Sequence, residues 1–280
     1  MNSVDIPMYK LNEKDEIKPN PIFHRPWDKL HSRCIEYPFA ASHLGDAGCI
    51  LDVGTVKSDP AWIAWLESLS RDIHATDYDP PDDSFENIDF VQSDVRSLPF
   101  EDNFFDAVLA VSVIEHIGLE DPQVELSELP PADQRGDVEA VRELTRVLKP
   151  EGKLVMTLPF GLVDGKILDG SARGYTESSL KRFNKVADIE SLDYYEYQHA
   201  SKKEHVEEYT KPVSLIKHIT LSIKNRLGLD PSSLNETEAP DVIPSRPGRV
   251  TWRRIRIKEA QATHNGHTDG VVAGVWSPLS

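Results

Sequence analysis

The feature that most constrains the fold is an alternation of short apolar runs with helical patterns between residues 49 and 158. Apolar residues repeat at helical spacing over 62–69 and over 138–148, and the other apolar runs are short enough to be strands. This alternation is typical of βαβ units and predicts an α/β protein with a doubly wound, mostly parallel sheet. The expected strands are 49–53, 73–77, 89–92, 105–111 and 153–158.

In a sheet of this kind, ligands bind beyond the carboxyl ends of the strands. Gly54 follows the first strand at such an end, and a glycine there lets the backbone come close to a ligand. Asp77 ends the second strand and is placed like the carboxylate that accepts hydrogen bonds from two ribose hydroxyls. The two residues together predict a nucleoside ligand, and the alternative is a purely structural turn followed by a surface acid.

Four longer segments narrow this interpretation. They are ILDVG (50–54), ATDYD (75–79), FVQSDVRSLPFEDNFFDAVLAVSVIEHI (90–117) and RELTRVLKPEGKLVMTLPFG (142–161). In this order and at these distances, they make residues 49–161 resemble the class I S-adenosylmethionine-dependent methyltransferases that act on small molecules. The resemblance implies S-adenosyl-L-methionine as cofactor and a Rossmann-like sheet of seven strands. The sixth strand is then expected at 192–197, and the last, at 270–276, is expected to run antiparallel and to close the edge.

The same resemblance assigns parts of the cofactor to successive strand ends. The ammonium of the methionine part favours carbonyl and carboxylate oxygens, whereas the adenine can donate to a carboxylate and accept from a backbone N–H. The cofactor-binding residues so implied are Asp52, Gly54 and Thr55 for the methionine part, Asp77 with Tyr78 for the ribose, Asp94 and Val95 for the adenine, and Ser112 and Val113 beside the sulfonium.

The predicted reaction needs few catalytic groups, because a sulfonium methyl group is a good electrophile and the protein mainly has to hold a nucleophile in line with it. A base is needed only when the acceptor starts protonated. His116, preceded by Glu115, is the candidate general base, since histidine is the side chain that most readily takes a proton near neutral pH. The alternative is that His116 only hydrogen-bonds within its loop and shapes it. We expect no metal site.

The turn after the first strand departs from the family pattern. Family members carry further glycines in this turn, as in GxGxG, whereas this chain has Val56 and Ser58 at the corresponding positions. Two functions therefore stay open. The first is a methyltransferase acting on an O, N or C atom of a small or medium-sized acceptor, and the second is an inactive domain that binds a partner or serves as a scaffold. An NAD-dependent oxidoreductase is disfavoured, because the turn lacks GxGxxG.

Charge and composition limit the partners and the location. A net charge of −16 argues against nonspecific nucleic-acid binding, which depends on a field of Lys and Arg. No stretch approaches the roughly 20 consecutive apolar residues of a membrane-spanning helix, and residues 1–20 lack the apolar block of a secretory signal. Cys34 and Cys49 are interpreted as packing residues and not as a disulfide or a nucleophile. The predicted location is the cytoplasm.

Three regions are predicted, namely an arm and helix over 1–45 that cover the pocket, a methyltransferase domain over 46–198 and 270–280, and an insertion over 199–269. The first region contains a helix at 27–44 that ends or kinks at Pro38. The insertion contains a helix at 213–227, which packs on the domain or instead forms a lid, a homodimer contact or a membrane-surface helix. A basic run over 246–256 either steers an anionic acceptor toward the pocket or is a solvated face.

Overall fold

In the computed structural model of the protein, the described residues are 16–17, 32–119, 123–198, 251–262 and 268–280. Most of the N-terminal arm, the predicted helix at 213–227 and most of the 199–269 insertion lie outside the described residues. No described helix combines the length and the apolar character needed to cross a membrane.

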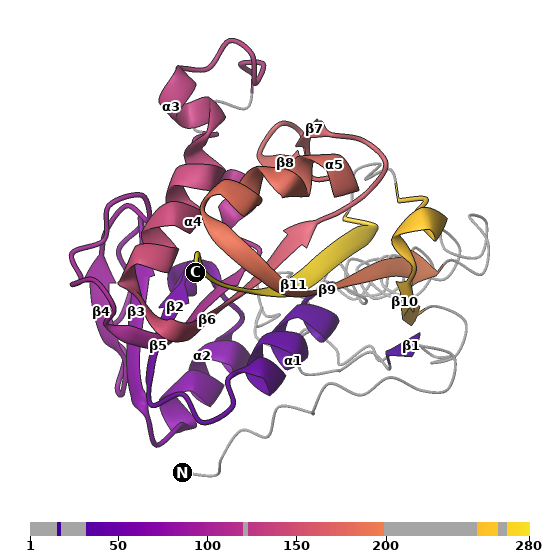
Figure 1. Ribbon diagram of the computed structural model, residues 1–280. Helices are drawn as coiled ribbons and strands as arrows, with labels where there is room; N and C mark the ends of the chain where they lie inside the picture. The colour runs from indigo at the N-terminus through magenta and orange to yellow at the C-terminus, as the bar shows by residue number, and fades with distance from the viewer. Residues whose placement is uncertain (1–15, 18–31, 120–122, 199–250, 263–267) are drawn as a thin grey trace, which may run out of the picture.

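A nine-stranded mixed sheet forms the centre of the molecule, in the order β1-β10-β9-β11-β6-β5-β2-β3-β4 (Figure 1). The five strands from β4 to β6 in this order are parallel to one another, whereas β11 runs antiparallel to both β6 and β9. The strands are β1 (Glu16–Ile17), β2 (Cys49–Val53), β3 (Asp72–Asp77), β4 (Asp89–Gln92), β5 (Phe105–Val111), β6 (Leu148–Pro159), β9 (Ala187–Gln198), β10 (Thr251–Ile255) and β11 (Gly270–Pro278). A separate hairpin pairs β7 (Gly165–Ile167) with β8 (Ala172–Gly174).

Helices cover both faces of the sheet, which is the arrangement expected of a doubly wound fold (Figure 1). The main ones are α1 (Arg33–His43), α2 (Pro60–Ser68) and α4 (Gly136–Val147). Shorter segments are α3 (Pro131–Gln134), α5 (Glu177–Leu180) and the 3₁₀ turns η2 (Thr55–Lys57), η3 (Ile114–His116), η4 (Lys181–Lys185) and η6 (Ile257–Glu259).

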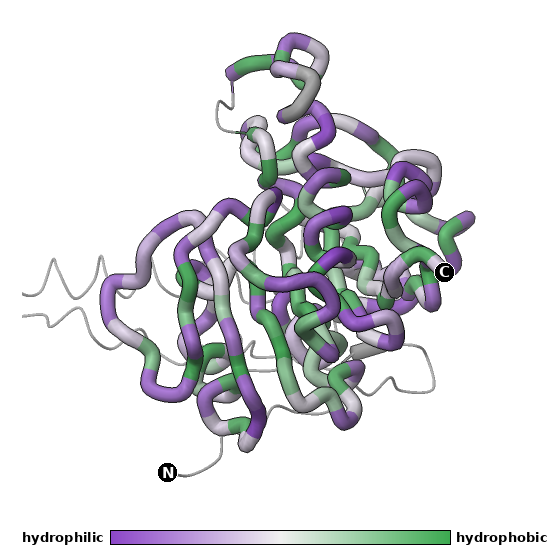
Figure 2. The backbone as a smooth tube through the Cα atoms, turned by 60° about the vertical axis from the view of Figure 1, so that its left-hand side comes forward, coloured by the Kyte–Doolittle hydropathy of each residue, from purple (hydrophilic) through white to green (hydrophobic). Residues whose placement is uncertain are grey.

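The hydrophobic core lies in two layers, one on each face of the sheet. In β5, Val108 and Ala110 pack into the layer under α4 and η4, whereas Leu109 faces the layer under α1 and α2. The second layer is centred on Trp62, whose ring stacks on Tyr37 with a centroid separation of 4.5 Å. Figure 2 shows hydrophobic colouring along the central strands. Each fully buried large apolar side chain contributes about 1.5–3 kcal/mol relative to exposure, so these layers fix the strand ends in place.

The predicted fold class is confirmed, but its last strand lies elsewhere than expected. β11 does not close the edge, because it is inserted between β6 and β9 and pairs with both. Its residues from Gly270 to Trp276 are buried, which explains the continuous apolar run in the sequence. β1 and β10, which the sequence analysis did not predict, extend the sheet beyond β9 and account for nine strands where seven were expected.

Two predicted boundaries are also corrected. The N-terminal helix α1 begins at Arg33 and continues through Pro38 to His43. Pro38 lies at the middle of this 11-residue helix, where it removes one backbone hydrogen bond, and the buried side chains of Tyr37 and Phe39 hold the segment on the sheet. The predicted strand at 153–158 begins at Leu148, directly after α4.

Candidate functional site

A cavity of about 1140 Å³ opens at the carboxyl ends of β2, β3, β4 and β5. Loops after four neighbouring parallel strands build its wall, as expected for a ligand site in an open α/β sheet. The structure brings nine of the eleven predicted site residues onto this wall: Gly54, Asp77, Tyr78, Asp94, Val95, Ser112, Val113, Glu115 and His116.

The turn after β2 depends on a glycine. Gly54 has a φ of 80°, in the left-handed region, and its N–H donates to the carbonyl of Thr76 at 2.8 Å. A Cβ at this position would lie 2.4 Å from Cγ2 of Val113, which lines the cavity. The turn therefore brings bare backbone to the cavity wall, with no room for a side chain.

Asp52 and Thr55 do not line the cavity, and their contact with the methionine part stays a prediction. Both are buried beneath it. Asp52 accepts hydrogen bonds from Thr55 Oγ1 at 2.6 Å and from Trp62 Nε1 at 3.1 Å. Burial raises the pKa of Asp52 to about 7. The hydrogen bonds from Thr55 and Trp62 lower the pKa, but burial has the larger effect. The two residues hold the turn in shape because their hydrogen bonds join β2, the turn and α2.

Val56 and Ser58, which replace the later glycines, do not fill the cavity. Both contribute to its wall, and the Val56 N–H donates to Oδ2 of Asp77 at 3.0 Å. The Ser58 hydroxyl turns back onto the carbonyl of Gly54, at 3.3 Å. The turn therefore uses the backbone of Val56 to orient the Asp77 carboxylate, a role that a side chain at this position does not obstruct.

Asp77 is held by two backbone donors at the cavity wall. Its Oδ1 accepts from the N–H of Asp79 at 3.1 Å, and its Oδ2 accepts from Val56 as described above. A carboxylate has about four lone-pair directions, so each oxygen can accept a further hydrogen bond. Asp77 is thus a fixed anionic acceptor facing a cavity.

Asp94 has a partner that the sequence analysis missed. The Arg96 guanidinium donates to both carboxylate oxygens of Asp94, at 2.7 to 3.1 Å, and also pairs with Asp133 at 2.9 Å. These hydrogen bonds from Arg96 lower the pKa of Asp94. Arg96 lines the cavity beside Val95. The signal for it was the basic residue two positions after the acid in the segment 94–96.

His116 is held in one tautomer by the β7–β8 hairpin. Its Nδ1 lies 2.6 Å from the carbonyl oxygen of Ser171. A carbonyl only accepts, so Nδ1 carries the proton and Nε2 of the neutral ring keeps its lone pair. Nε2 lies 3.8 Å from Oε1 of Glu115. This geometry orients Nε2 as the basic atom of the ring.

Glu115 is a buried acid next to that ring. Its side chain is only 2% exposed, and its Oε2 has no hydrogen-bond partner among the described residues. Burial raises the pKa of Glu115, while the neighbouring His116 lowers it. A positive charge on His116 is therefore stabilised by Glu115, and the ionised Glu115 by His116.

Two further arginines shape the site. Arg33, at the start of α1, lines the cavity and pairs with the buried Glu36, whose Oε1 accepts from Ser112 Oγ at 3.3 Å. This places the start of α1 beside the cavity, and coverage of the pocket by residues 1–45 stays a prediction. Arg173, in β8, is buried and donates to the backbone carbonyls of Ile117 and of Asp133, the latter at 2.6 Å. The hairpin was not predicted, and Gly170, which has a φ of 87° in its turn, was the available signal.

The basic run does not reach this cavity within the described residues. Arg253, Arg254 and Arg256 line a second hollow, of about 570 Å³, beside β9 and β10. Arg254 lies 3.7 Å from Asp193, which offsets part of its charge. Steering of an anionic acceptor by this run stays a prediction, and Arg246 and Arg249 lie outside the described residues.

Comparison with known proteins points in the same direction as the geometry. The model of the family described as "Methyltransferase domain" matches residues 51–130. The ubiquinone/menaquinone biosynthesis C-methyltransferase UbiE of Pseudomonas aeruginosa (strain LESB58) is 31% identical over 108 residues, which are 39% of this chain. The match spans 35% of the length of that relative.

Among solved structures, the [4+2]-cyclase SpnF has a TM-score of 0.49 at 16% identity, covering 96% of this chain and 88% of SpnF. The 1,6-didemethyltoxoflavin-N1-methyltransferase of Burkholderia thailandensis has a TM-score of 0.43 at 17% identity, covering 56% of this chain and 69% of that enzyme. Neither similarity bears on what this chain binds. The family match lies on the strands and turns that build the cavity, and residues 51–130 are similar to a methyltransferase domain.

Proposed function

We propose that this chain transfers the methyl group of S-adenosyl-L-methionine to an oxygen, nitrogen or carbon atom of a small or medium-sized acceptor. The observation that carries the proposal is Asp77, a carboxylate oriented by two backbone N–H groups on the wall of a large cavity, inside the segment that matches the methyltransferase family. Such a carboxylate can accept hydrogen bonds from both hydroxyls of a ribose.

The residues around the cavity fit the proposed cofactor. The bare backbone at Gly54 suits close approach of the methionine part, and its neighbouring carbonyls suit an ammonium group. The N–H of Val95 suits a ring nitrogen of adenine, while Asp94 must share its oxygens with Arg96. When bound, the cofactor supplies an electrophilic methyl group on a positively charged sulfur.

His116 acts as general base in this proposal whenever the acceptor starts protonated. Its Nε2 accepts the proton from the acceptor, because the carbonyl of Ser171 holds the proton of the ring on Nδ1. Glu115 stabilises the resulting imidazolium from 3.8 Å. Arg173 keeps the 115–118 segment in register by binding its backbone carbonyls. General-base catalysis of this kind contributes about 10²- to 10⁴-fold to a rate.

The finer properties of the partners belong to the same proposal. An anionic acceptor would be attracted by the basic run, and a homodimer would form through the predicted helix at 213–227. A reducing cytoplasm suits the two cysteines, which the structure does not join in a disulfide.

Calorimetry with S-adenosylhomocysteine, the demethylated cofactor, tests the proposal, with NAD⁺ as the control nucleotide. We expect saturable binding of one S-adenosylhomocysteine per chain and no heat with NAD⁺. Absence of S-adenosylhomocysteine binding would contradict the proposal and favour a domain that kept the fold without the reaction. Transfer of a labelled methyl group to a panel of small acceptors then identifies the acceptor class.

A further inference from the structure

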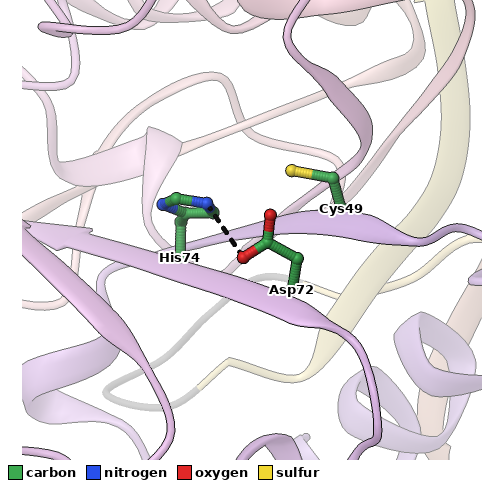
Figure 3. A group of neighbouring side chains, drawn as sticks. All are labelled: Cys49, Asp72 and His74. Carbon is green, nitrogen blue, oxygen red and sulfur yellow. Dashed lines mark ion pairs between the residues drawn. The ribbon is translucent and has the colours of Figure 1, made fainter.

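Three side chains with different metal-ligand atoms meet at the opposite end of the sheet, where β2 and β3 begin (Figure 3). We propose that Cys49, Asp72 and His74 bind a divalent transition-metal ion, for which Zn²⁺ is the best match. Their ligand atoms, one sulfur, one carboxylate oxygen and one imidazole nitrogen, all lie within 4.8 Å of one another. The inference is independent of the proposed methyl transfer.

The register of the two strands brings the three residues together. Cys49 and Asp72 are direct partners in the parallel pairing of β2 with β3. His74 follows Asp72 by two positions in the same strand, so both side chains leave the sheet on the same face. Figure 3 shows the three side chains on this face, with the Cys49 sulfur directed toward the other two.

His74 provides the strongest indication of a missing ligand. Its Nε2 is buried and has no hydrogen-bond partner among the described residues, although Oδ1 of Asp72 lies 3.3 Å away in a geometry too poor for a hydrogen bond. A buried polar atom left without a partner costs about 1–3 kcal/mol. A metal ion between Nε2 of His74 and Oδ1 of Asp72 would give each of these two atoms a partner.

The His74 ring is also fixed in place before any ion binds. Three phenylalanine rings surround it in edge contacts, with centroids 5.8 Å (Phe100), 5.5 Å (Phe104) and 5.4 Å (Phe105) away. A ligand held by packing loses little conformational freedom on binding, and this favours affinity.

The set of ligand atoms selects the class of ion. Zn²⁺ binds a mixture of thiolate, imidazole and carboxylate in four-coordinate sites, whereas Ca²⁺ and Mg²⁺ prefer oxygen ligands alone. Three protein ligands leave one position for water. One thiolate and one carboxylate balance the charge of a divalent ion. On binding, the S–H bond of Cys49 breaks, a sulfur–metal bond forms and the proton passes to solvent.

The surroundings allow an ion to enter. The Asp72 side chain is 59% exposed and the His74 side chain 13% exposed. The ion would therefore lie at the rim of the sheet, joining the first residues of β2 and β3. Such a link stabilises the fold in proportion to the logarithm of the metal concentration over its dissociation constant.

Titration of the EDTA-treated full-length protein with Co²⁺ tests the proposal by absorption spectroscopy. We expect one equivalent of Co²⁺ to give a thiolate-to-metal charge-transfer band and tetrahedral ligand-field bands, and Zn²⁺ to displace them. The absence of these bands in the wild-type protein would overturn the proposal.

Variants assign the bands to the three residues. Cys49→Ser should abolish the charge-transfer band, whereas Cys34→Ala, which alters the other cysteine, should keep it. His74→Phe keeps an aromatic ring among the three phenylalanines and should weaken Co²⁺ binding about 10-fold or more, a size typical of damage to a metal site. Circular dichroism and S-adenosylhomocysteine binding report on folding in each variant. A charge-transfer band that survives in folded Cys49→Ser, or unchanged affinity in folded His74→Phe, would refute the assignment.

Discussion

The two ends of β2 and β3 are built from the same strands but present different chemistry. At the carboxyl ends, backbone N–H groups orient the Asp77 carboxylate, and the strands open into a large cavity. At the starting ends, side chains from Cys49, Asp72 and His74 crowd together, and a buried ring nitrogen has no hydrogen-bond partner among the described residues.

The difference shows what loops add to a sheet. After the strands, the turns at 54–58 and 77–79 supply backbone donors that orient a carboxylate, and this suits a polar organic ligand. Before the strands, only the alternation and register of side chains bring ligand atoms together, and this suits an ion. The predictions below separate the two ends.

The largest expected effect belongs to Gly54. Gly54→Val places a branched side chain at a φ of 80° and against Val113. We expect the affinity for S-adenosylhomocysteine to fall by at least about 100-fold and the free energy of unfolding to fall by roughly 1–3 kcal/mol. Calorimetry and urea denaturation measure the two quantities.

Gly45→Ala is the matched control for Gly54. Gly45 also has a positive φ, of 55°, but a Cβ there meets nothing within 4 Å. The Gly45→Ala variant should lose up to about 1–2 kcal/mol of stability, which is the usual cost of a side chain in the left-handed region. Its affinity for S-adenosylhomocysteine should be unchanged. Wild-type affinity in Gly54→Val would show that the turn does not approach the ligand.

Asp77 and Asp72 offer a sharper comparison, because they are the last and first residues of the same strand. Asp77→Asn keeps the size of the side chain but removes the charge. Hydrogen bonds to a charged group contribute about 1.5–3 kcal/mol, so S-adenosylhomocysteine should bind about 10- to 100-fold more weakly by calorimetry.

Asp72→Asn should leave that affinity unchanged and weaken Co²⁺ binding instead. Equal affinities for S-adenosylhomocysteine in the two variants would remove the distinction between the two ends of β3.

A further effect concerns stability and pH at the buried Asp52. Burial raises the pKa of Asp52 to about 7 in the folded protein, above the ordinary value of about 4 for an unfolded chain. The folded state then binds more protons than the unfolded state between these values, so Asp52 makes stability fall as pH rises from about 4 to about 7.

Asp52→Asn should remove this contribution, so that its unfolding free energy declines less over this pH range than that of the wild-type protein. Urea denaturation at several pH values measures both slopes. Parallel curves for the two proteins would contradict the assignment.

Much of the fold followed from local patterns in the sequence. β2, β4 and β5 have the predicted bounds, because each apolar run lies between clear turn signals. The helical spacing over 62–69 lies mostly in α2, where Asp59 caps the helix by accepting a hydrogen bond from the Ala61 N–H at 2.9 Å and Pro60 takes the first helical position.

The remaining features depend on contacts between distant segments. The place of β11 between β6 and β9 follows from pairing across the sheet, which the apolar run at 270–276 does not specify. The contact of Ser171 with His116 joins residues 55 positions apart. The cluster of Cys49 with Asp72 and His74 likewise depends on the register of β2 with β3, so no short sequence motif contains it.

A crystal structure of the protein with S-adenosylhomocysteine tests the central claim most directly. The account predicts that the ligand fills the cavity at the ends of β2 to β5, with both ribose hydroxyls about 2.7 Å from the carboxylate oxygens of Asp77. A ligand bound elsewhere, or one whose ribose makes no contact with Asp77, would contradict it.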